Sequence, residues 1–316
     1  MRELKGRRVL VTGGNGFLGR SVCRELNERG VTDLIVPRRS EYDLTHENAV
    51  EQLFSDSRPE IVIHLAAEVG GIGANRANPG RYFYTNMAMG LHVIEASRRH
   101  GVGKIVQVGT VCSYPKHSPV PFREDDLWDG YPEETNAPYG IAKKSLLVML
   151  QAYREQYQLN GIYLVPVNLY GPGDNFDPET SHVIPALIRK FVSARDVNSP
   201  QVELWGTGSA SREFLHVDDA ASGIVMAAEC FEGPEPVNLG TGREVTIKDL
   251  AETIGDLTGY DGQMVWDPSK PDGQPRRMLD TSRARESFGF EAKIPLKTGL
   301  KQTIAWWEES QRSRAS

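Results

Sequence analysis

The stretch VLVTGGNGFLG, residues 9–19, joins an apolar run that predicts a β-strand to a segment that predicts an α-helix. Three of its four glycines, at positions 13, 16 and 19, have the spacing of a dinucleotide-binding loop. Gly13 permits a tight turn, Gly16 lets backbone N–H groups approach a pyrophosphate, and Gly19 permits close packing of the helix on the strand. The helix N-terminus then points its positive dipole end at the phosphates. A glycine loop in this strand–helix setting predicts a dinucleotide-binding site.

Strand-like and helix-like segments alternate from residue 7 to about residue 170. The expected strands are nearly continuous runs of Val, Ile and Leu, which is typical of parallel strands covered on both faces. They lie at 8–13, 33–37, 61–67, 104–110 and 162–168, with expected helices near 17–29, 46–56, 80–100 and 138–158. This alternation predicts an α/β fold with a Rossmann-type, doubly wound parallel sheet.

The pattern loosens after residue 170 and predicts a smaller α/β lobe that binds the substrate. The expected elements are helices near 182–194, 217–231, 246–258 and 296–309, and strands at 202–205 and 236–240. The helix near 217–231 and the strand at 236–240 look like a return to the main sheet. We therefore expect a dinucleotide-binding domain of residues 1–168 plus 213–242, and a substrate lobe of residues 169–212 plus 243–316.

The composition of the 316 residues argues against several classes of protein. The net charge of −6 and the lack of a basic tract argue against nucleic acid or a membrane surface as a partner. The longest apolar run is far shorter than the ~20 residues of a membrane span, and no secretory signal precedes the first strand. Cys23, Cys112 and Cys230 are too few and too widely spaced for a disulfide framework or a metal site. We expect a cytoplasmic protein with free thiols, in which Cys23 and Cys230 are packing residues.

The end of the second expected strand favours NADP over NAD. An NAD site typically has an acidic residue there, whereas this chain has Arg38 and Arg39. A guanidinium matches the geometry of a 2′-phosphate, although two arginines can also form a solvated loop. Small residues after the third strand would let the adenosine lie against the sheet. The expected cofactor contacts up to the fourth strand are Gly13, Asn15, Gly16, Phe17, Leu18, Gly19, Arg38, Arg39, Asp43, Leu44, Leu65, Ala66, Ala67, Val108 and Gly109.

Three further residues predict a site that handles a carbonyl oxygen. Tyr139 and Lys143 are four residues apart on an expected helix, so their side chains share one face. A Lys143 ammonium beside Tyr139 is expected to lower the pKa of the phenol. Thr110 follows the fourth strand and can bind the same substrate oxygen. The alternative is an ordinary amphipathic helix with an incidental Tyr and Lys.

The glycine loop and the Tyr-x-x-x-Lys pattern resemble the extended short-chain dehydrogenase/reductase family. Longer segments resemble its branch of epimerase/reductases that act on GDP-4-keto-6-deoxy sugars, and the likeness covers nearly the whole chain. These segments are EVGGIGAN (68–75), CSYPK (112–116), ETNAPYGIAK (134–143), NLYGPGDNF (168–176), SHVIPALIRKF (181–191), REFLHVDD (212–219) and KPDGQPRRMLD (270–280).

The resemblance implies roles for residues at matching positions. Tyr139 would donate a proton, with Lys143 as its partner, and Cys112 and His182 would form the acid/base pair for epimerisation. Thr110 stands where the family has a serine, and Lys190 where it usually has an arginine. The loop GGNGFLG looks more like that of nucleotide-sugar epimerases. Contacts to the nicotinamide end would come from Lys143, Asn168, Leu169, Tyr170 and His182, and contacts to the GDP-sugar from Lys190, Trp205, Arg212 and Asp272.

The resemblance implies an NADPH-dependent epimerisation and 4-keto reduction that gives GDP-L-fucose or a close relative. A reductase or epimerase of another nucleotide-linked 4-keto sugar, such as a deoxyheptose or dideoxyhexose, is the alternative. A catalytically silent NADP-binding sensor is the alternative from another class of protein. Family members pair through two long helices, which would here be the helices near 80–100 and 138–158. A homodimer with a four-helix bundle is therefore expected.

Overall fold

The computed structural model describes residues 4–270 and 274–315. Its centre is a six-stranded parallel sheet in the order β2-β1-β3-β4-β5-β9. The strand order reverses between β1 and β3, which is the switch point at which ligands bind in doubly wound sheets. The α/β fold expected from the sequence is confirmed. The bounds of the strands are β1 Arg8–Thr12, β2 Asp33–Ile35, β3 Ile61–His64, β4 Lys104–Val108, β5 Gly161–Pro166 and β9 Val237–Leu239.

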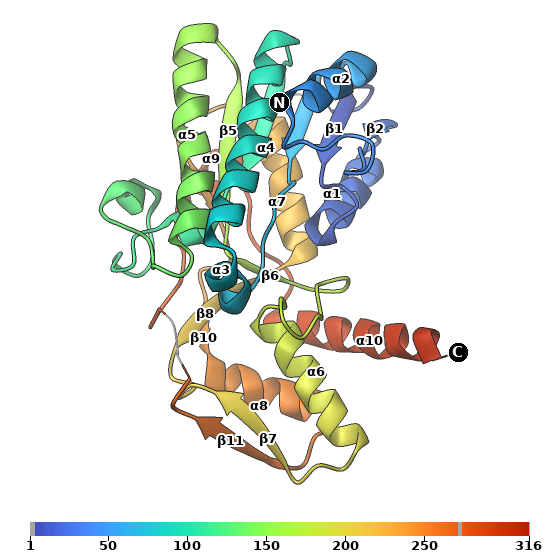
Figure 1. Cartoon of the computed structure of the whole chain (residues 1–316), viewed down its shortest axis with the longest axis vertical. Helices are drawn as coiled ribbons and strands as arrows, with labels where there is room; N and C mark the ends of the chain where they lie inside the picture. The colour runs from blue at the N-terminus through green and yellow to red at the C-terminus, as the bar shows by residue number, and fades with distance from the viewer. Residues whose placement is uncertain (1–3, 271–273, 316) are drawn as a thin grey trace.

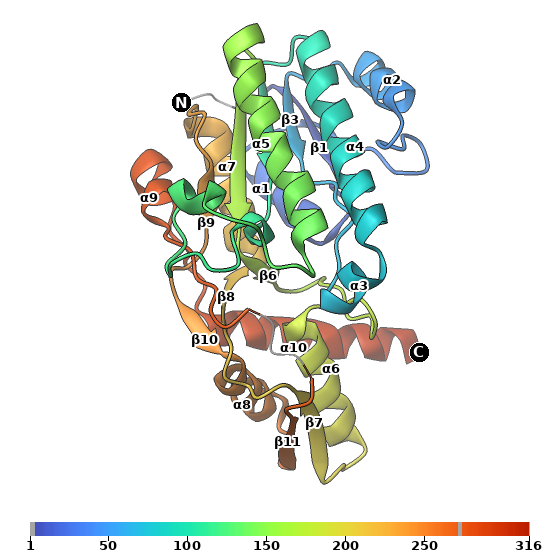
Figure 2. The ribbon, with the colours of Figure 1, turned by 60° about the vertical axis from the view of Figure 1, so that its left-hand side comes forward.

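Helices cover both faces of this sheet (Figures 1 and 2). The helices α2, α4 and α5 lie on one face, and α1 and α7 pack together on the other. The inner strands are buried because both faces are covered, with Val9, Leu10 and Val11 fully shielded from solvent, whereas β2 at the edge is partly exposed. These helices are α1 Phe17–Glu28, α2 Glu47–Ser57, α4 Pro79–Arg99, α5 Ala137–Tyr157 and α7 Val217–Cys230.

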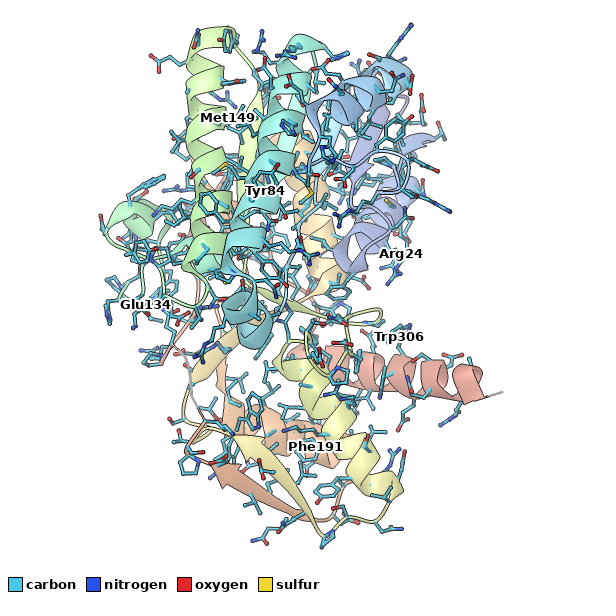
Figure 3. All side chains as sticks on the ribbon, in the orientation of Figure 1. Arg24, Tyr84, Glu134, Met149, Phe191 and Trp306 are labelled. Carbon is cyan, nitrogen blue, oxygen red and sulfur yellow. The ribbon has the colours of Figure 1, made fainter. Side chains whose placement is uncertain are left out.

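A second group of elements lies beyond the carboxyl ends of the central strands (Figure 1). It contains a three-stranded sheet, β10-β8-β6, and a two-stranded sheet, β11-β7. A separate hydrophobic cluster holds it together, with Phe191 of α6 fully buried in it (Figure 3). Its elements are β6 Asn168–Tyr170, α6 Val183–Asp196, β7 Gln201–Trp205, β8 Ser211–His216, β10 Glu244–Thr246, α8 Ile247–Thr258, β11 Gln263–Asp267 and α10 Leu296–Ala315.

The elements that the sequence pattern did not predict are short. They are β6, β8, β10, β11, the helices α3 Ile72–Ala77 and α9 Ser282–Phe288, and the 3-10 turns η1 Val111–Ser113 and η2 Glu124–Trp128. Strand β10, for example, has three residues and pairs with β8, more than thirty residues earlier in the chain. Such strands depend on a distant partner and carry too few residues to show a period. The strands expected at 61–67 and 104–110 end earlier, at His64 and Val108.

The glycine loop has the tight geometry that its sequence predicts. Gly13 has a φ of +73°, and a Cβ atom there would lie 2.8 Å from the backbone nitrogen of Ala66. A Cβ atom at Gly19 would collide with the carbonyl oxygen of Gly13. The loop therefore packs against the end of β3 on one side and against α1 on the other, and only glycine fits these two positions.

Glu213 on β8 ties three distant segments together beside the cavity described below. Its carboxylate accepts hydrogen bonds from the backbone N–H groups of Thr241, Gly242 and Leu279, the last two at 2.8 and 2.6 Å. Its own N–H donates to the carbonyl oxygen of Arg277 at 3.0 Å. Burial raises the pKa of Glu213, and the backbone donors act against that rise.

We predict that Glu213→Gln lowers the free energy of unfolding by about 1.5–3 kcal/mol, because hydrogen bonds to a charged acceptor are lost and an amide NH₂ meets backbone donors. Urea denaturation measures the change, and Glu252→Gln on the exposed side of α8 is the matched control. Equal unfolding midpoints for Glu213→Gln and the wild type would contradict this assignment.

Candidate active site

A single cavity of about 1290 Å³ lies at the carboxyl ends of β1, β3 and β4 and extends to α6 and β7. It gathers nearly all of the site residues expected from the sequence. The exceptions are Asp272, which lies outside the described residues, and Tyr170, which does not line the cavity. The expected residues that line the cavity are Gly13, Asn15, Gly16, Phe17, Leu18, Gly19, Arg38, Arg39, Asp43, Leu44, Leu65, Ala66, Ala67, Val108, Gly109, Thr110, Cys112, Tyr139, Lys143, Asn168, Leu169, His182, Lys190, Trp205 and Arg212.

The N-terminus of α1 forms one end of the cavity. Gly16 is the N-cap residue and has no side chain to cap the first-turn N–H groups. Those N–H groups have no partner within the helix and carry a positive partial charge. A diphosphate can therefore lie against them. This donor set fits the pyrophosphate of a dinucleotide.

Arg38 and Arg39 stand farther along the same wall and are exposed. The Nε atom of Arg39 lies 3.6 Å from a carboxylate oxygen of Asp43. The other oxygen of Asp43 accepts hydrogen bonds from the backbone N–H and the hydroxyl of Thr45, at 3.0 and 2.7 Å. These bonds lower the pKa of Asp43 and keep it anionic. Two guanidiniums here, with no acid at the end of β2, fit a cofactor that carries a 2′-phosphate.

Tyr139 and Lys143 lie on one face of the first turns of α5, at 7% and 2% exposure. Burial raises the pKa of Tyr139, and a hydrogen bond with Thr110 acts against that rise. Burial also lowers the pKa of Lys143 to about 8. The expectation that Lys143 lowers the pKa of Tyr139 is therefore wrong for this structure. Loss of hydration is the largest cause of the shift in each group, and Lys143 is not among the groups that lower the pKa of Tyr139.

Close backbone packing orients this pair. The hydroxyl of Tyr163 on β5 donates to the carbonyl oxygen of Lys143 at 2.9 Å, and Ser113 donates to that of Gly140 at 3.0 Å. A Cβ atom at Gly140 would collide with the carbonyl oxygen of Cys112. The start of α5 is thus fixed against the turn after β4, so Tyr139 and Cys112 keep a constant separation.

Cys112 and His182 reach the cavity from different parts of the chain. Cys112 lies in η1, where its backbone N–H donates to the hydroxyl of Thr110 at 3.2 Å. His182 is the N-cap residue of α6, but its side chain does not cap the helix. The ring is open to the cavity, while the surrounding walls lower its pKa through desolvation, with a smaller contribution from Arg277. A neutral imidazole whose ring forms no hydrogen bond with the described residues can accept a proton.

The far end of the cavity carries an exposed aromatic ring that lies near two ammonium groups. The ring of Trp205 on β7 is 63% exposed. The Nζ atoms of Lys190 and Lys270 lie 5.7 and 5.8 Å from its centroid. Lys190 also donates to the carbonyl oxygen of Glu203 at 2.9 Å. A flat ring with cations around it suits a purine and its phosphates.

Two further expectations need correction. Tyr170 does not line the cavity; it is buried, and its hydroxyl donates to the carbonyl oxygen of Leu296 at 3.3 Å. Cys230 is exposed at the end of α7 and does not pack, whereas Cys23 contacts the core as expected. In both cases the direction of the one side chain depends on the elements that pack against it, which the local sequence does not show.

Several polar residues line the cavity that were not expected from the sequence: Glu133, Asn136, Asp174, Gln274 and Arg277. Burial raises the pKa of Asp174 to about 7, and one of its oxygens has no partner among the described residues. Arg277 has 8% exposure and points its Nη1 atom at the thiol of Cys112. All of these residues except Glu133 lie within the segments quoted above, and Glu133 directly precedes one of them. Other polar residues stand beside them in the same segments, so the residue type alone did not show which side chains face the cavity.

The described residues contain no group of His, Cys, Asp and Glu that could hold a metal ion. Within the same part of the chain, none of the helices is both long and apolar enough to cross a membrane.

Comparisons with known proteins agree with this architecture. Probable GDP-L-fucose synthase 1 of Oryza sativa subsp. japonica is 44% identical over 307 residues, which cover 97% of this chain and 93% of that protein. GDP-L-fucose synthase of Escherichia coli (strain K12) is 40% identical over 313 residues, which cover 96% and 97%.

Two solved structures show the same overall fold. A GDP-6-OMe-4-keto-L-xylo-heptose reductase from C. jejuni has a TM-score of 0.91 and 30% identity, and the match covers 98% of this chain and 99% of that one. A GDP-L-fucose synthetase from Naegleria fowleri bound to NADP has a TM-score of 0.89 and 28% identity, with 98% and 96% covered. A family model matches residues 9–240, and the chain belongs to the NAD dependent epimerase/dehydratase family that this model describes.

Proposed function

We propose that the chain is an NADPH-dependent enzyme that epimerises a GDP-4-keto-6-deoxy sugar and reduces it at C4, giving GDP-L-fucose or a close relative. One observation carries the proposal. A single cavity holds a phosphate-binding helix end, the set Thr110, Tyr139 and Lys143, and the pair Cys112 and His182. The names of relatives that match nearly the whole chain support the same activity.

Epimerisation depends on the ketone at C4 of the sugar. This group acidifies the protons on C3 and C5, so a base can remove one of them. Inversion then requires an acid on the opposite face of the ring. Cys112 from the end of β4 and His182 from the start of α6 approach the cavity from separate elements. Thr110 and Tyr139 would stabilise the charge that develops on the C4 oxygen.

Reduction uses the same oxygen site. When bound, NADPH supplies a hydride to C4. Tyr139 keeps its proton at neutral pH, because burial raises the pKa of its phenol, and it can donate that proton to the C4 oxygen. Lys143, with a pKa of about 8, is mostly an ammonium at pH 7 and would hold the nicotinamide ribose together with Asn168 and Leu169. The Lys143 ammonium would also stabilise the negative charge that develops on the phenol oxygen of Tyr139 as its proton leaves.

A reductase of a GDP-linked 4-keto heptose is the second candidate. It is favoured by the similarity to the C. jejuni heptose reductase over almost the full length of both chains. The two candidates differ in the group that C5 of the sugar carries, and so in the room required near that carbon. The substrate experiment below separates them.

We also propose that two copies pair through α4 and α5. The two helices lie side by side on the outer face of the sheet (Figures 1 and 2). Tyr84 and Leu91 of α4 and Val148 of α5 are exposed by 65%, 42% and 49%, and Figure 3 marks Tyr84 on this surface. An apolar helix pair of this kind would be covered by the same pair from a second copy. Sedimentation velocity tests the proposal, and a monomer at micromolar concentration contradicts it.

We also propose that one lobe binds the cofactor and the other binds the nucleotide sugar. The cofactor would occupy residues 1–168 plus 213–242, and the nucleotide sugar would occupy residues 169–212 plus 243–316. Two hydrophobic clusters support this division, one around the central sheet and one around α6 and α8. A cytoplasmic location is proposed from the three free thiols, because an oxidising compartment does not keep thiols reduced.

The cofactor assignment predicts that NADPH binds more tightly than NADH. Replacing Arg39 with alanine should weaken NADPH binding by about 1.5–3 kcal/mol, the range for hydrogen bonds to a charged group, and leave NADH binding nearly unchanged. Fluorescence titration gives both dissociation constants. Arg312→Ala, at an exposed position of α10, is the control. A clear preference for NADH would refute the assignment.

The substrate assignment predicts oxidation of NADPH when GDP-4-keto-6-deoxy-mannose is added. Absorbance of the reduced nicotinamide follows the reaction, and NMR identifies the product sugar. Tyr139→Phe removes one hydroxyl and should abolish turnover while NADPH affinity stays close to the wild-type value. Turnover of a GDP-4-keto heptose alone would favour the second candidate, and substantial turnover by Tyr139→Phe would exclude this tyrosine as the proton donor.

The acid/base assignment predicts that Cys112→Ser and His182→Asn lose deuterium exchange from solvent at C3 or C5. Both variants should reduce the ketone without inversion, because Thr110, Tyr139 and Lys143 are intact. Cys112→Ser should retain NADPH affinity, whereas His182→Asn also removes an expected contact to the nicotinamide end, so its NADPH affinity is measured separately. Mass spectrometry of the sugar in D₂O reports the exchange. Wild-type exchange in both variants would mean that the thiol and the imidazole do not invert the sugar carbons.

A further inference from the structure

Arg277 is a buried cation for which the mechanism above has no task. Its side chain has 8% exposure and lines the cavity. Its Nε and Nη2 atoms both donate to the side-chain oxygen of Gln274, at 3.2 and 3.0 Å. No carboxylate in the described part of the chain forms an ion pair with it. A buried charge without a counter-ion is costly, so this guanidinium is expected to meet an anion during the reaction.

The third nitrogen of Arg277 points at a reacting atom. Its Nη1 atom lies 3.8 Å from the sulfur of Cys112. A cysteine that gives up its proton becomes a thiolate, and adjacent arginines stabilise thiolates. A Cys112 thiolate can therefore serve as the counter-ion of Arg277. Its sulfur lies within hydrogen-bond distance of the Nη1 atom.

Backbone and side-chain bonds hold Arg277 in this place. Its carbonyl oxygen accepts from the N–H of Glu213 at 3.0 Å. Gln274, which binds two of its nitrogens, donates to the carbonyl oxygen of Lys116 at 2.8 Å. The guanidinium is thus fixed at both ends of its side chain, and it is already in position before a charge appears on the sulfur.

We propose that Arg277 is a positioning residue for epimerisation, and that it acts by stabilising the Cys112 thiolate formed when the thiol protonates the sugar carbon. This inference rests on the proposed function. His182 takes the proton from the carbon as one C–H bond breaks. The S–H bond of Cys112 then breaks on the opposite face, a new C–H bond forms, and the electron pair stays on sulfur. Solvent finally carries the proton from the imidazolium back to the thiolate.

The protonation states of the other ionisable groups around Cys112 are consistent with His182 as the base and Cys112 as the acid. Tyr139 and Lys143 of α5, Glu133 ahead of it and His182 ahead of α6 line the same cavity. Burial keeps the Tyr139 phenol protonated, so it adds no negative charge beside the sulfur. Desolvation and the charge of Arg277 both lower the pKa of His182, so the imidazole starts neutral and can act as the base.

The first experiment measures the acidity of the thiol without any turnover. The rate of alkylation of Cys112 by iodoacetamide is followed across pH by peptide mass spectrometry, in the wild type, Arg277→Met, Arg277→Lys and Arg276→Met. Exposed Cys230 is the internal reference. Arg276 is the matched control, since it lies next in the chain, is exposed and pairs with Glu244.

The pH midpoint for Cys112 alkylation should rise by about one unit in Arg277→Met, as expected when an adjacent cation is lost. Arg277→Lys should restore most of the shift, and Arg276→Met should match the wild type. An unchanged midpoint in Arg277→Met, with NADPH affinity retained as proof of folding, would overturn the proposal.

The second experiment separates this role from substrate binding. In D₂O with GDP-4-keto-6-deoxy-mannose, Arg277→Met should lower the kcat for deuterium exchange about tenfold and leave KM nearly unchanged. A raised KM with unchanged kcat would overturn the proposal and assign Arg277 to an anionic group of the substrate. A shifted alkylation midpoint with no exchange by the wild type would support the coupling of Arg277 to Cys112 and contradict the proposed function.

Discussion

Burial of the parallel strands on both faces is the constraint on which the remaining structure depends. Because β1, β3 and β4 are covered by helices on each side, most of their residues are buried Val, Ile and Leu, and their carboxyl ends meet at one edge. The chain leaves the sheet there as the glycine loop, the Leu65–Ala67 segment and the turn that carries Thr110 and Cys112. The residues of the candidate site either follow these strands directly or lie on other elements that line the same cavity.

Loss of hydration governs the electrostatics at that edge. It raises the pKa of Tyr139 and lowers the pKa values of Lys143 and His182. The charged form is disfavoured in each case, so the resting cavity contains a phenol, a neutral imidazole and an ammonium that readily loses its proton. Such groups can exchange protons near neutral pH with little reorganisation. Arg277 is the exception, since a guanidinium keeps its charge when it is buried.

The segment of residues 274–280 shows how distant parts of the chain complete the site. Backbone hydrogen bonds join it to β8 and to Phe122, and the carboxylate of Glu213 holds its Leu279. Gln274 and Arg277 reach the cavity from this segment. This side of the cavity is therefore assembled from residues far along the chain from the central strands, and its geometry depends on buried polar contacts more than on apolar packing.

The sequence by itself determined the α/β class, the glycine loop and the helix that carries Tyr139 and Lys143. Each of these is encoded in a local pattern of spacing, and local patterns need no knowledge of distant residues. Only the tertiary structure decided that burial raises the pKa of Tyr139, that Tyr170 packs away from the cavity and that Arg277 faces Cys112 across 165 positions of sequence. These depend on which atoms surround a side chain, and pairing between distant segments decides that in three dimensions.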